Sequence, residues 1–219
     1  MYKSSSEWET FLTNLGAFFL HDGNPLRPHP LLTEGDHSSG FFNGSLLAFD
    51  HPDLAEQMSR DLADRILVSL GYETSRAHIK IVGPEYGAIS VAAFAAARLH
   101  VGYVLARPEG EGKNKTMTLD TRFKVAGFSL LRVEDTITTG GSLAKTRIVC
   151  EESGASTHQL CGAWCNRSGL EEVDGSKIIA VINRKMDQWK PEDCPLCTLG
   201  SKALRPKEGN NWGLLTKAY

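Results

Sequence analysis

Two adjacent acids, followed by small and hydroxyl side chains, are the residues of this sequence best suited to chemistry. An apolar run leads into Glu134 and Asp135, and the segment continues as Thr136, Ile137, Thr138, Thr139, Gly140, Gly141 and Ser142. Backbone N–H groups at a glycine-rich turn and helix start attract a phosphate, whereas carboxylates suit sugar hydroxyls or Mg²⁺. The pattern predicts a strand that runs into a loop able to hold a phosphate and a polyol together. The plainer alternative is an ordinary strand, turn and helix N-cap.

Alternating apolar elements must position this segment. Continuous apolar runs are typical of buried parallel strands, and right-handed crossovers between them give a doubly wound, mainly parallel sheet flanked by helices. We therefore expect an α/β fold whose ligands lie beyond the carboxyl ends of the strands. The expected strands are 78–82, 101–106, 128–133, 159–165 and 177–182, and the expected helices are 52–70, 88–99 and 143–150.

Two further loops follow predicted strands at the same edge. Glu85, Tyr86 and Gly87 come after the strand 78–82, and Arg167 comes after the strand 159–165. Each feature alone is most often a plain turn or a surface charge. Because the carboxyl ends of parallel strands meet at one edge, we expect these loops to converge on the acidic pair.

The two ends of the chain have sequence patterns that differ from that of the middle. A first amphipathic helix, capped by Ser6 and reaching Phe19, precedes a long irregular stretch from 22 to 50 that is rich in Gly, Pro, His and Ser. Asp50 is the expected cap of the next helix. This organisation predicts an N-terminal helix and hood over 1–50, an α/β core over 51–190, and a C-terminal extension of the same domain over 191–219.

Composition narrows the class of protein. The chain has 219 residues and a formal charge of −2, and no cluster of Lys and Arg stands out, which argues against nucleic acid as a partner. No apolar run approaches the roughly 18 residues of a membrane-spanning helix. The first residues lack the apolar region of a signal peptide. These features favour a cytoplasmic protein with no membrane partner.

The five cysteines raise the question of a metal site. Cys194 and Cys197 form a CxxC, and Cys161 and Cys165 could in principle complete a four-thiolate zinc site. The spacing of the second pair is unusual for zinc, and that pair falls in a predicted strand. Reduced, partly buried thiols are the expected state, and the sequence leaves metal binding by Cys194 and Cys197 open.

The segment 130–142 resembles the signature of the type I phosphoribosyltransferases, which bind 5-phosphoribosyl 1-diphosphate (PRPP). The resemblance implies their fold, with a small N-terminal hood beside the α/β core. It also implies that PRPP is bound by the residues Glu85, Tyr86, Gly87, Arg107, Glu134, Asp135, Thr136, Ile137, Thr138, Thr139, Gly140, Gly141 and Ser142. Mg²⁺ is the implied cofactor, held through PRPP, with Glu134 and Asp135 as further candidate ligands.

Nearly the whole chain resembles the orotate branch of these enzymes. His37-Ser38-Ser39-Gly40-Phe41-Phe42-Asn43 is similar to the family's pyrimidine-binding segment, and Arg167 matches the arginine that pairs with the orotate carboxylate. The residues 192–197 also resemble a C-terminal stretch of some members. The resemblance implies transfer of the 5-phosphoribosyl group from PRPP to orotate, giving orotidine 5′-monophosphate in pyrimidine synthesis. Phe41, Phe42, Thr138 and Arg167 are the implied orotate-binding residues.

The polar segment 109–116 resembles the family's flexible loop. The resemblance implies that this loop closes over the site of a neighbouring subunit, and hence a homodimer. Asp135, Lys113 and Lys115 are the implied catalytic residues. The residues 116–119 are similar to the return side of that loop.

Three positions depart from the family pattern. Thr33, Gly87 and Pro108 stand where well-known members carry lysines. Two alternatives therefore remain open: a phosphoribosyltransferase for another base, and a non-catalytic homologue that binds PRPP. An unrelated α/β nucleotide-binding protein is a third, but the sequence has neither a P-loop lysine motif nor a Gly-x-Gly-x-x-Gly.

Overall fold

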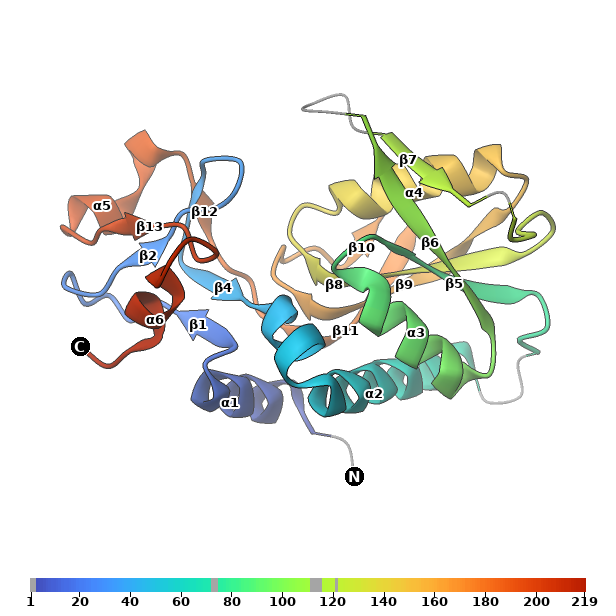
Figure 1. The fold of residues 1–219 in the computed structure, drawn as a ribbon, viewed down its shortest axis with the longest axis horizontal. Coiled ribbons are helices and arrows are strands. Elements are labelled where there is room, and N and C mark those ends of the chain that lie inside the picture. Colours follow the sequence, from blue (N-terminus) through green and yellow to red (C-terminus); the bar gives the residue numbers. More distant parts are fainter. Residues whose placement is uncertain (1–2, 72–74, 111–115, 121) are drawn as a thin grey trace. The chain divides into compact units, whose positions relative to one another are not determined.

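A computed structural model describes residues 3–71, 75–110, 116–120 and 122–219. The chain divides into two compact units (Figure 1). The sheet unit contains residues Met1–Ser6 and Gly44–Arg184, and the terminal unit contains Glu7–Asn43 and Lys185–Tyr219. The segments predicted as 1–50 and 191–219 thus fall largely within one unit, which both ends of the chain build together.

The sheet unit is organised around one mainly parallel sheet, as predicted. Its strand order among the described residues is β10-β11-β9-β8-β5-β6-β7 (Figure 1). The five central strands run parallel, and the two edge strands, β10 and β7, pair antiparallel with their neighbours. The bounds are β5 (Ile79–Pro84), β6 (Gly102–Glu109), β7 (Thr116–Leu119), β8 (Ser129–Ile137), β9 (Ser156–Asn166), β10 (Glu172–Val173) and β11 (Ser176–Asn183).

Helices cover both faces of this sheet (Figure 1). On one face lie α2 (Pro52–Leu70) and α3 (Ala88–Leu99), and Leu62 and Ile66 of α2 pack over Gly162 of β9. On the other face lies α4 (Gly141–Glu152), whose Cys150 joins a core cluster with Val82 and Leu130. The alternation of side chains along each strand accounts for the two separate cores.

Small residues bring α3 close to the sheet. Four alanines of α3 are buried, and a Cβ on Gly83 would lie 2.8 Å from the Cβ of Ala88. Any side chain at position 83 would push the start of α3 away from the end of β5. The turn between β5 and α3 is therefore fixed by packing as well as by sequence.

The terminal unit is built from short paired strands. Here β1 (Phe18–Leu20) pairs with β4 (Gly40–Phe42), β2 (His29–Pro30) with β13 (Ala203–Leu204), and β3 (His37–Ser38) with β12 (Gln188–Trp189). The last two pairs each join an N-terminal strand to a C-terminal one. The unit also contains α5 (Pro195–Thr198), α6 (Asn211–Thr216), a 3₁₀ turn at Pro191–Asp193 and most of α1 (Ser5–Leu15).

Several predicted boundaries were wrong. The first helix ends at Leu15 because Gly16 adopts a φ of 75°, so Phe18 and Phe19 lie in β1 instead. Asp50 is not a helix cap: it ends a π-helical turn, Leu46–Asp50, and His51 precedes α2 without a capping side chain. The stretch 22–50 is not wholly irregular, since it contains β2, β3 and β4.

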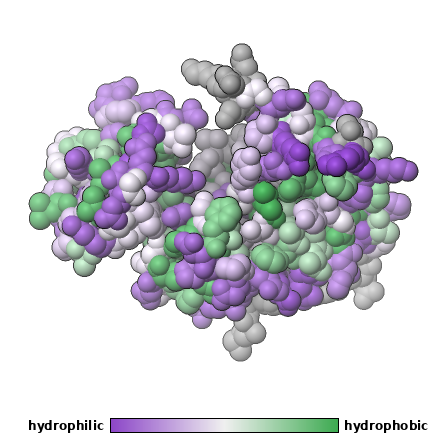
Figure 2. Space-filling view, in the orientation of Figure 1, coloured by the Kyte–Doolittle hydropathy of each residue, from purple (hydrophilic) through white to green (hydrophobic). Residues whose placement is uncertain are grey.

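No described helix is both long and apolar enough to cross a membrane. Figure 2 shows hydrophilic residues over much of the face that it draws, with hydrophobic patches between them.

Candidate active site

The end of β8 and the start of α4 form the predicted phosphate loop. Strand β8 continues to Ile137, beyond the predicted end at Val133. The two acids therefore lie among the last four residues of the strand. Thr138 and Thr139 are exposed, Gly140 turns the chain, and α4 begins at Gly141. The first N–H groups of a helix have no partner within it, and the exposed Gly141 and Ser142 place theirs at the surface, where that of Gly141 donates to Thr139 Oγ1 at 3.4 Å.

Gly140 is required at this turn for two reasons. Its φ of 79° is in the left-handed region that favours glycine. A Cβ at this position would also lie 2.8 Å from Cγ2 of Val173 in β10. The loop backbone therefore rests directly on the β10–β11 hairpin.

Arg132 holds the same loop from below. This side chain is fully buried in β8, and its Nη1 donates to the carbonyl of Leu143 in the first turn of α4 at 2.7 Å. Its Nη2 donates to Ser176 Oγ at 2.7 Å, and Nη1 lies 3.3 Å from Asp174 Oδ2. Sequence reasoning missed this residue, although a lone arginine inside an apolar strand was a usable signal.

The acidic pair is close to the start of α3. A Cβ on Gly87 would lie 2.8 Å from Asp135 Oδ1, so the two loops touch at a point where only glycine fits. Asp135 Oδ1 also accepts a hydrogen bond from the N–H of Thr136 at 2.7 Å. Burial and, secondly, the charge of Asp135 raise the pKa of Glu134 well above its usual value.

Glu85, Tyr86 and Arg107 lie at the same edge of the sheet. The N–H of Glu85 donates to the carbonyl of Ala106 in β6, and Arg107 Nε donates to Glu85 Oε1 at 3.0 Å. The ion pair is largely exposed on the arginine side, and Tyr86 is 76% exposed. Of these three predicted residues, Tyr86 and Arg107 expose their side chains, whereas Glu85 is mostly covered.

Arg167 begins the third loop of this edge. Its N–H donates to the carbonyl of Ile137 at 3.0 Å, which joins this loop to the end of β8. The side chain is buried, not a surface charge, and this burial lowers its pKa to about 10. Arg167 therefore stays cationic at neutral pH in a place where water screens it poorly.

Asn166, which precedes that arginine, has a structural role. Its Nδ2 donates to the carbonyl of Leu170 and to Asn183 Oδ1, while its Oδ1 accepts from the backbone and hydroxyl of Ser168. The amide thus uses both its donors and its acceptor to shape the turn that carries Arg167.

The predicted pyrimidine-binding aromatics lie in the terminal unit. Phe42 is 4% exposed and pairs with Phe18 in the β1–β4 ladder. Phe41 is half-buried, and its ring lies 5.5 Å from that of Trp212 at an angle of 60°. Within this unit, Phe41 and Trp212 are thus better placed than Phe42 to meet a planar ligand. No periodic pattern in the sequence singles out Trp212.

Two of the three departures from the family pattern are in ordinary surroundings. Thr33 lies exposed in the turn between Leu32 and Asp36, and Pro108 lies in β6 opposite Met117 of β7. The β6–β7 pairing is the expected return of the loop. Lys113 and Lys115, the predicted catalytic lysines, lie outside the described residues.

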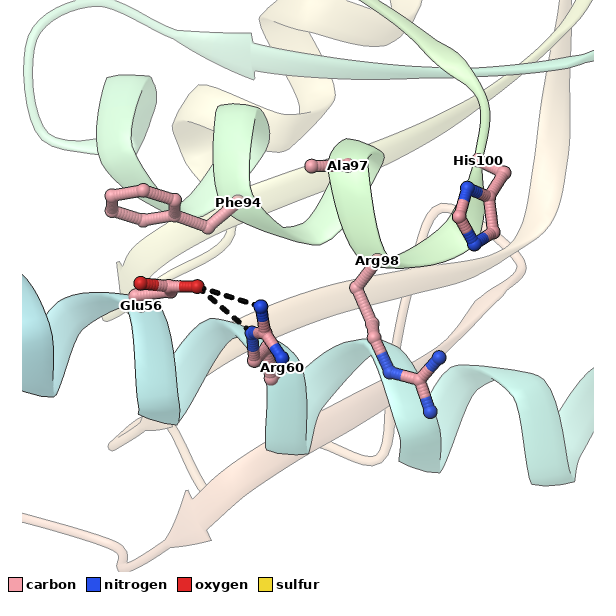
Figure 3. Close-up of a pocket in the computed structure, with 6 residues that line it drawn as sticks. All are labelled: Glu56, Arg60, Phe94, Ala97, Arg98 and His100. Atoms are coloured by element: carbon pink, nitrogen blue, oxygen red, sulfur yellow. Dashed lines mark hydrogen bonds and ion pairs between the residues drawn. The ribbon is translucent and has the colours of Figure 1, made fainter.

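A pocket of about 230 Å³ lies elsewhere in the sheet unit (Figure 3). It is lined by Glu56 and Arg60 of α2, which form an ion pair. The other lining residues include Phe94 and Arg98 of α3 and His100, which follows that helix. Because α3 starts at the predicted site and His100 follows its other end, this pocket is not the predicted ligand site.

Comparison with solved structures identifies the fold of the chain. No protein-family model matches the chain. The crystal structure of orotate phosphoribosyltransferase from Aeropyrum pernix superposes with a TM-score of 0.56 at 22% identity, covering 80% of this chain and 92% of that one. Adenine phosphoribosyltransferase from Thermoanaerobacter pseudethanolicus gives 0.51 at 22%, covering 66% and 88%. The fold is that of the type I phosphoribosyltransferases.

Sequence similarity narrows this class. The orotate phosphoribosyltransferase of Pelotomaculum thermopropionicum is 34% identical over 191 residues, which cover 87% of this chain and 94% of that protein. The chain belongs to the orotate phosphoribosyltransferase family.

Proposed function

We propose that this chain is a pentosyltransferase that moves the 5-phosphoribosyl group from PRPP to orotate, releasing diphosphate and orotidine 5′-monophosphate. One observation carries the proposal: in a member of this family, the acids Glu134 and Asp135 end a central strand directly before the left-handed Gly140 and the open start of α4. Carboxylates for sugar hydroxyls and amides for a phosphate then follow one another along the chain, as PRPP requires.

The binding of PRPP follows from this order. The N–H groups and hydroxyls from Thr138 to Ser142 would hold the 5′-phosphate, and Glu134 and Asp135 would hold the ribose hydroxyls. Glu85, Tyr86 and Gly87 would lie along the diphosphate, with Arg107 supplying positive charge. Holding both ends of PRPP leaves C1 of the ribose exposed to attack by N1 of the base.

The donor set at the strand end also suits Mg²⁺. Glu134 and Asp135 offer hard carboxylate oxygens, which this ion prefers, beside the place assigned to the diphosphate. Bound Mg²⁺ would neutralise part of the diphosphate charge and so help it to leave.

Recognition of orotate would rest on charge and shape. Orotate is a planar anion, and Arg167 is a buried cation with the fork geometry that carboxylates match. Phe41 would supply the flat apolar surface, and Thr138 a hydroxyl at the base.

We also propose that the active protein is a homodimer. The β6–β7 hairpin carries the segment 109–116, and its lysines Lys113 and Lys115 would bring positive charge to the diphosphate of the neighbouring subunit's site. Closure of this segment would exclude water, which would otherwise hydrolyse PRPP.

A second candidate function is PRPP binding without efficient transfer. It is favoured by Gly87, since the contact with Asp135 leaves no room there for the lysine of well-known members. A protein of this kind would bind PRPP with Mg²⁺ but release no diphosphate when orotate is added.

A panel of bases tests the proposal. Orotate, uracil, adenine and hypoxanthine are each incubated with PRPP, Mg²⁺ and the protein, and diphosphate release is measured. We expect release with orotate and at least about tenfold less with uracil, which lacks only the carboxylate that Arg167 would bind. Equal use of uracil would refute the role of Arg167, preference for a purine would indicate another acceptor, and PRPP binding with no release would support the second candidate.

A further inference from the structure

Four side chains of the terminal unit gather into a cluster unrelated to the chemistry described above. The His–Cys cluster contains His29, His37, Cys194 and Cys197, and its four ligand atoms all lie within 4.8 Å of one another. Three of these residues are buried, and Cys197 is exposed. Cysteine thiolates and imidazoles together are the preferred ligands of zinc.

Four distances within the His–Cys cluster lie within about 0.3 Å of those expected around a single tetrahedral ion. Typical Zn–S and Zn–N bonds would separate sulfur from nitrogen by about 3.5 Å and two nitrogens by about 3.3 Å. The Sγ atoms of Cys194 and Cys197 each lie 3.6 Å from His29 Nε2, and Cys197 Sγ lies 3.3 Å from His37 Nδ1. The two histidine nitrogens are 3.0 Å apart.

We propose that His29, His37, Cys194 and Cys197 bind one structural zinc ion. Four protein ligands fill a tetrahedral sphere and leave no position for water or substrate, which is typical of structural and not of catalytic zinc. An iron–sulfur cluster fits less well, because His₂Cys₂ clusters place the histidines and cysteines on different irons. Here Cys197 Sγ is close to both histidine nitrogens.

The surroundings of His29 are those of a metal ligand. Its Nδ1 lies 2.8 Å from Ser201 Oγ, and this hydroxyl donates to the carbonyl of Arg27 at 2.6 Å. The serine hydrogen is thus used, so His29 Nδ1 must donate to Ser201, and Nε2 keeps its lone pair toward the cluster. A second hydrogen bond that fixes the tautomer in this way is usual for zinc-bound histidines.

The proposed ion would join the two ends of the chain. His29 and His37 lie in β2 and β3, and Cys194 and Cys197 lie at the start and inside of α5. The strands β2, β3, β12 and β13 have two residues each, and such short ladders supply little stability alone. A metal is a common staple for a small unit of this kind.

This assignment replaces the four-cysteine site considered from the sequence. Cys161 and Cys165 lie in β9 of the sheet unit, where Cys161 belongs to an apolar core cluster. The CxxC is retained, but its partners are two histidines, spaced as His-x₇-His, whose role the sequence did not reveal.

Metal analysis of the full-length protein tests the proposal. The chain is produced without a histidine tag in zinc-supplemented cells, passed over a weak chelator, and analysed by inductively coupled plasma mass spectrometry. We expect about one zinc per chain in the wild type and less than about a tenth in the variant Cys194→Ser/Cys197→Ser. The matched controls Cys150→Ala and His100→Asn, which lie outside the cluster, should keep the full zinc content.

A second measurement does not depend on the folding of any variant. Metal-free, reduced wild-type protein is titrated with Co²⁺, which should give the intense visible bands of a tetrahedral thiolate site and saturate at one equivalent, and Zn²⁺ should then displace it. The absence of these bands when Co²⁺ is added to the metal-free protein would overturn the proposal. Full zinc content in the double cysteine variant would equally overturn it, because the metal would then be held elsewhere.

Discussion

At the scale of single residues, the contact between Gly87 and Asp135 determines where the Asp135 carboxylate lies. The position of a Cβ on Gly87 is 2.8 Å from Oδ1 and 3.0 Å from Oδ2 of that carboxylate. Contacts this short do not occur in folded proteins, so any side chain at position 87 must displace Asp135. The absence of a lysine at position 87 and the position of the Asp135 carboxylate are therefore linked by this one contact.

This contact predicts the effect of Gly87→Ala. The added methyl group should displace the Asp135 carboxylate and weaken PRPP binding about tenfold, equivalent to about 1.4 kcal/mol. The measurement is the KM for PRPP at saturating orotate. Gly102→Ala is the control, because its Cβ would meet only Lys80 side-chain atoms at 3.6 Å or more, and it should leave the KM unchanged. Equal values for both variants would show that Asp135 does not bind PRPP.

Arg167 gives a prediction on the other substrate. Removing a charged partner of a carboxylate costs about 1.5–3 kcal/mol, so Arg167→Ala should raise the KM for orotate by about 10- to 100-fold and leave the KM for PRPP almost unchanged. Arg167→Lys should fall between, since it keeps the charge and loses the fork. Circular dichroism checks that the variants fold. An increase confined to PRPP would refute the assignment.

At the scale of elements, the phosphate loop is held in place by a buried arginine in the strand that precedes it. Arg132 connects β8 to the first turn of α4 and to the β10–β11 hairpin through its contacts with Leu143, Ser176 and Asp174. The loop itself can thus consist of small residues, because the contacts of Arg132 stabilise it.

Arg132→Met should therefore reduce both stability and PRPP affinity. The substitution leaves buried acceptors unsatisfied, and we expect a loss of about 3 kcal/mol or more in the free energy of unfolding, measured by urea titration. Arg60→Met is the control, because it removes only an exposed pair with Glu56 worth about 0.5 kcal/mol or less. Unchanged stability of Arg132→Met would show that this network does not hold the loop.

The sequence predicted the elements of the sheet better than those of the terminal unit. Continuous apolar runs identified the parallel strands and the alanine-rich α3. The end of β8 was missed because the adjacent acids Glu134 and Asp135 are poor strand formers alone. They are extended here because β9 lies alongside, with Glu134 opposite Ala163 and Thr136 opposite Cys165. Two-residue strands such as β2 and β3 carry no periodic pattern to detect.

Only some residues of the candidate site were likewise predicted from the sequence. Local motifs named the acids, the glycines and Arg167, since each follows a predicted strand. Arg132 was missed because its role depends on partners such as Leu143, Val173 and Ser176, up to 44 positions away. His29 and His37 were missed for the same reason, since their cysteine neighbours are more than 150 positions further along the chain.

At the scale of the whole molecule, the chain folds back so that residues Glu7–Asn43 and Lys185–Tyr219 build one unit. Residues Gly44–Arg184, together with the first six residues, form the sheet unit with the phosphate loop. An assembly of two chains would add the segment 109–116 of one subunit to the site of the other. This exchange is a prediction about the assembly that solution experiments can test.

Subunit complementation tests it directly. The variants Asp135→Asn and Lys113→Ala/Lys115→Ala should each be nearly inactive. A homodimer with exchanged loops should regain up to about a quarter of wild-type turnover when the two are unfolded and refolded together, because each mixed dimer has one intact site. No recovery would indicate that the loop serves its own subunit, and an active Lys113→Ala/Lys115→Ala variant would show that these lysines do not act in the reaction.

The central claim is that the end of β8 and the start of α4 hold PRPP. The most direct measurement is isothermal titration of PRPP with Mg²⁺ into the wild type and into Asp135→Asn. We predict saturable binding with one site per chain for the wild type, and at least about tenfold weaker binding for the variant. Equal affinities, or no binding by the wild type, would contradict the account.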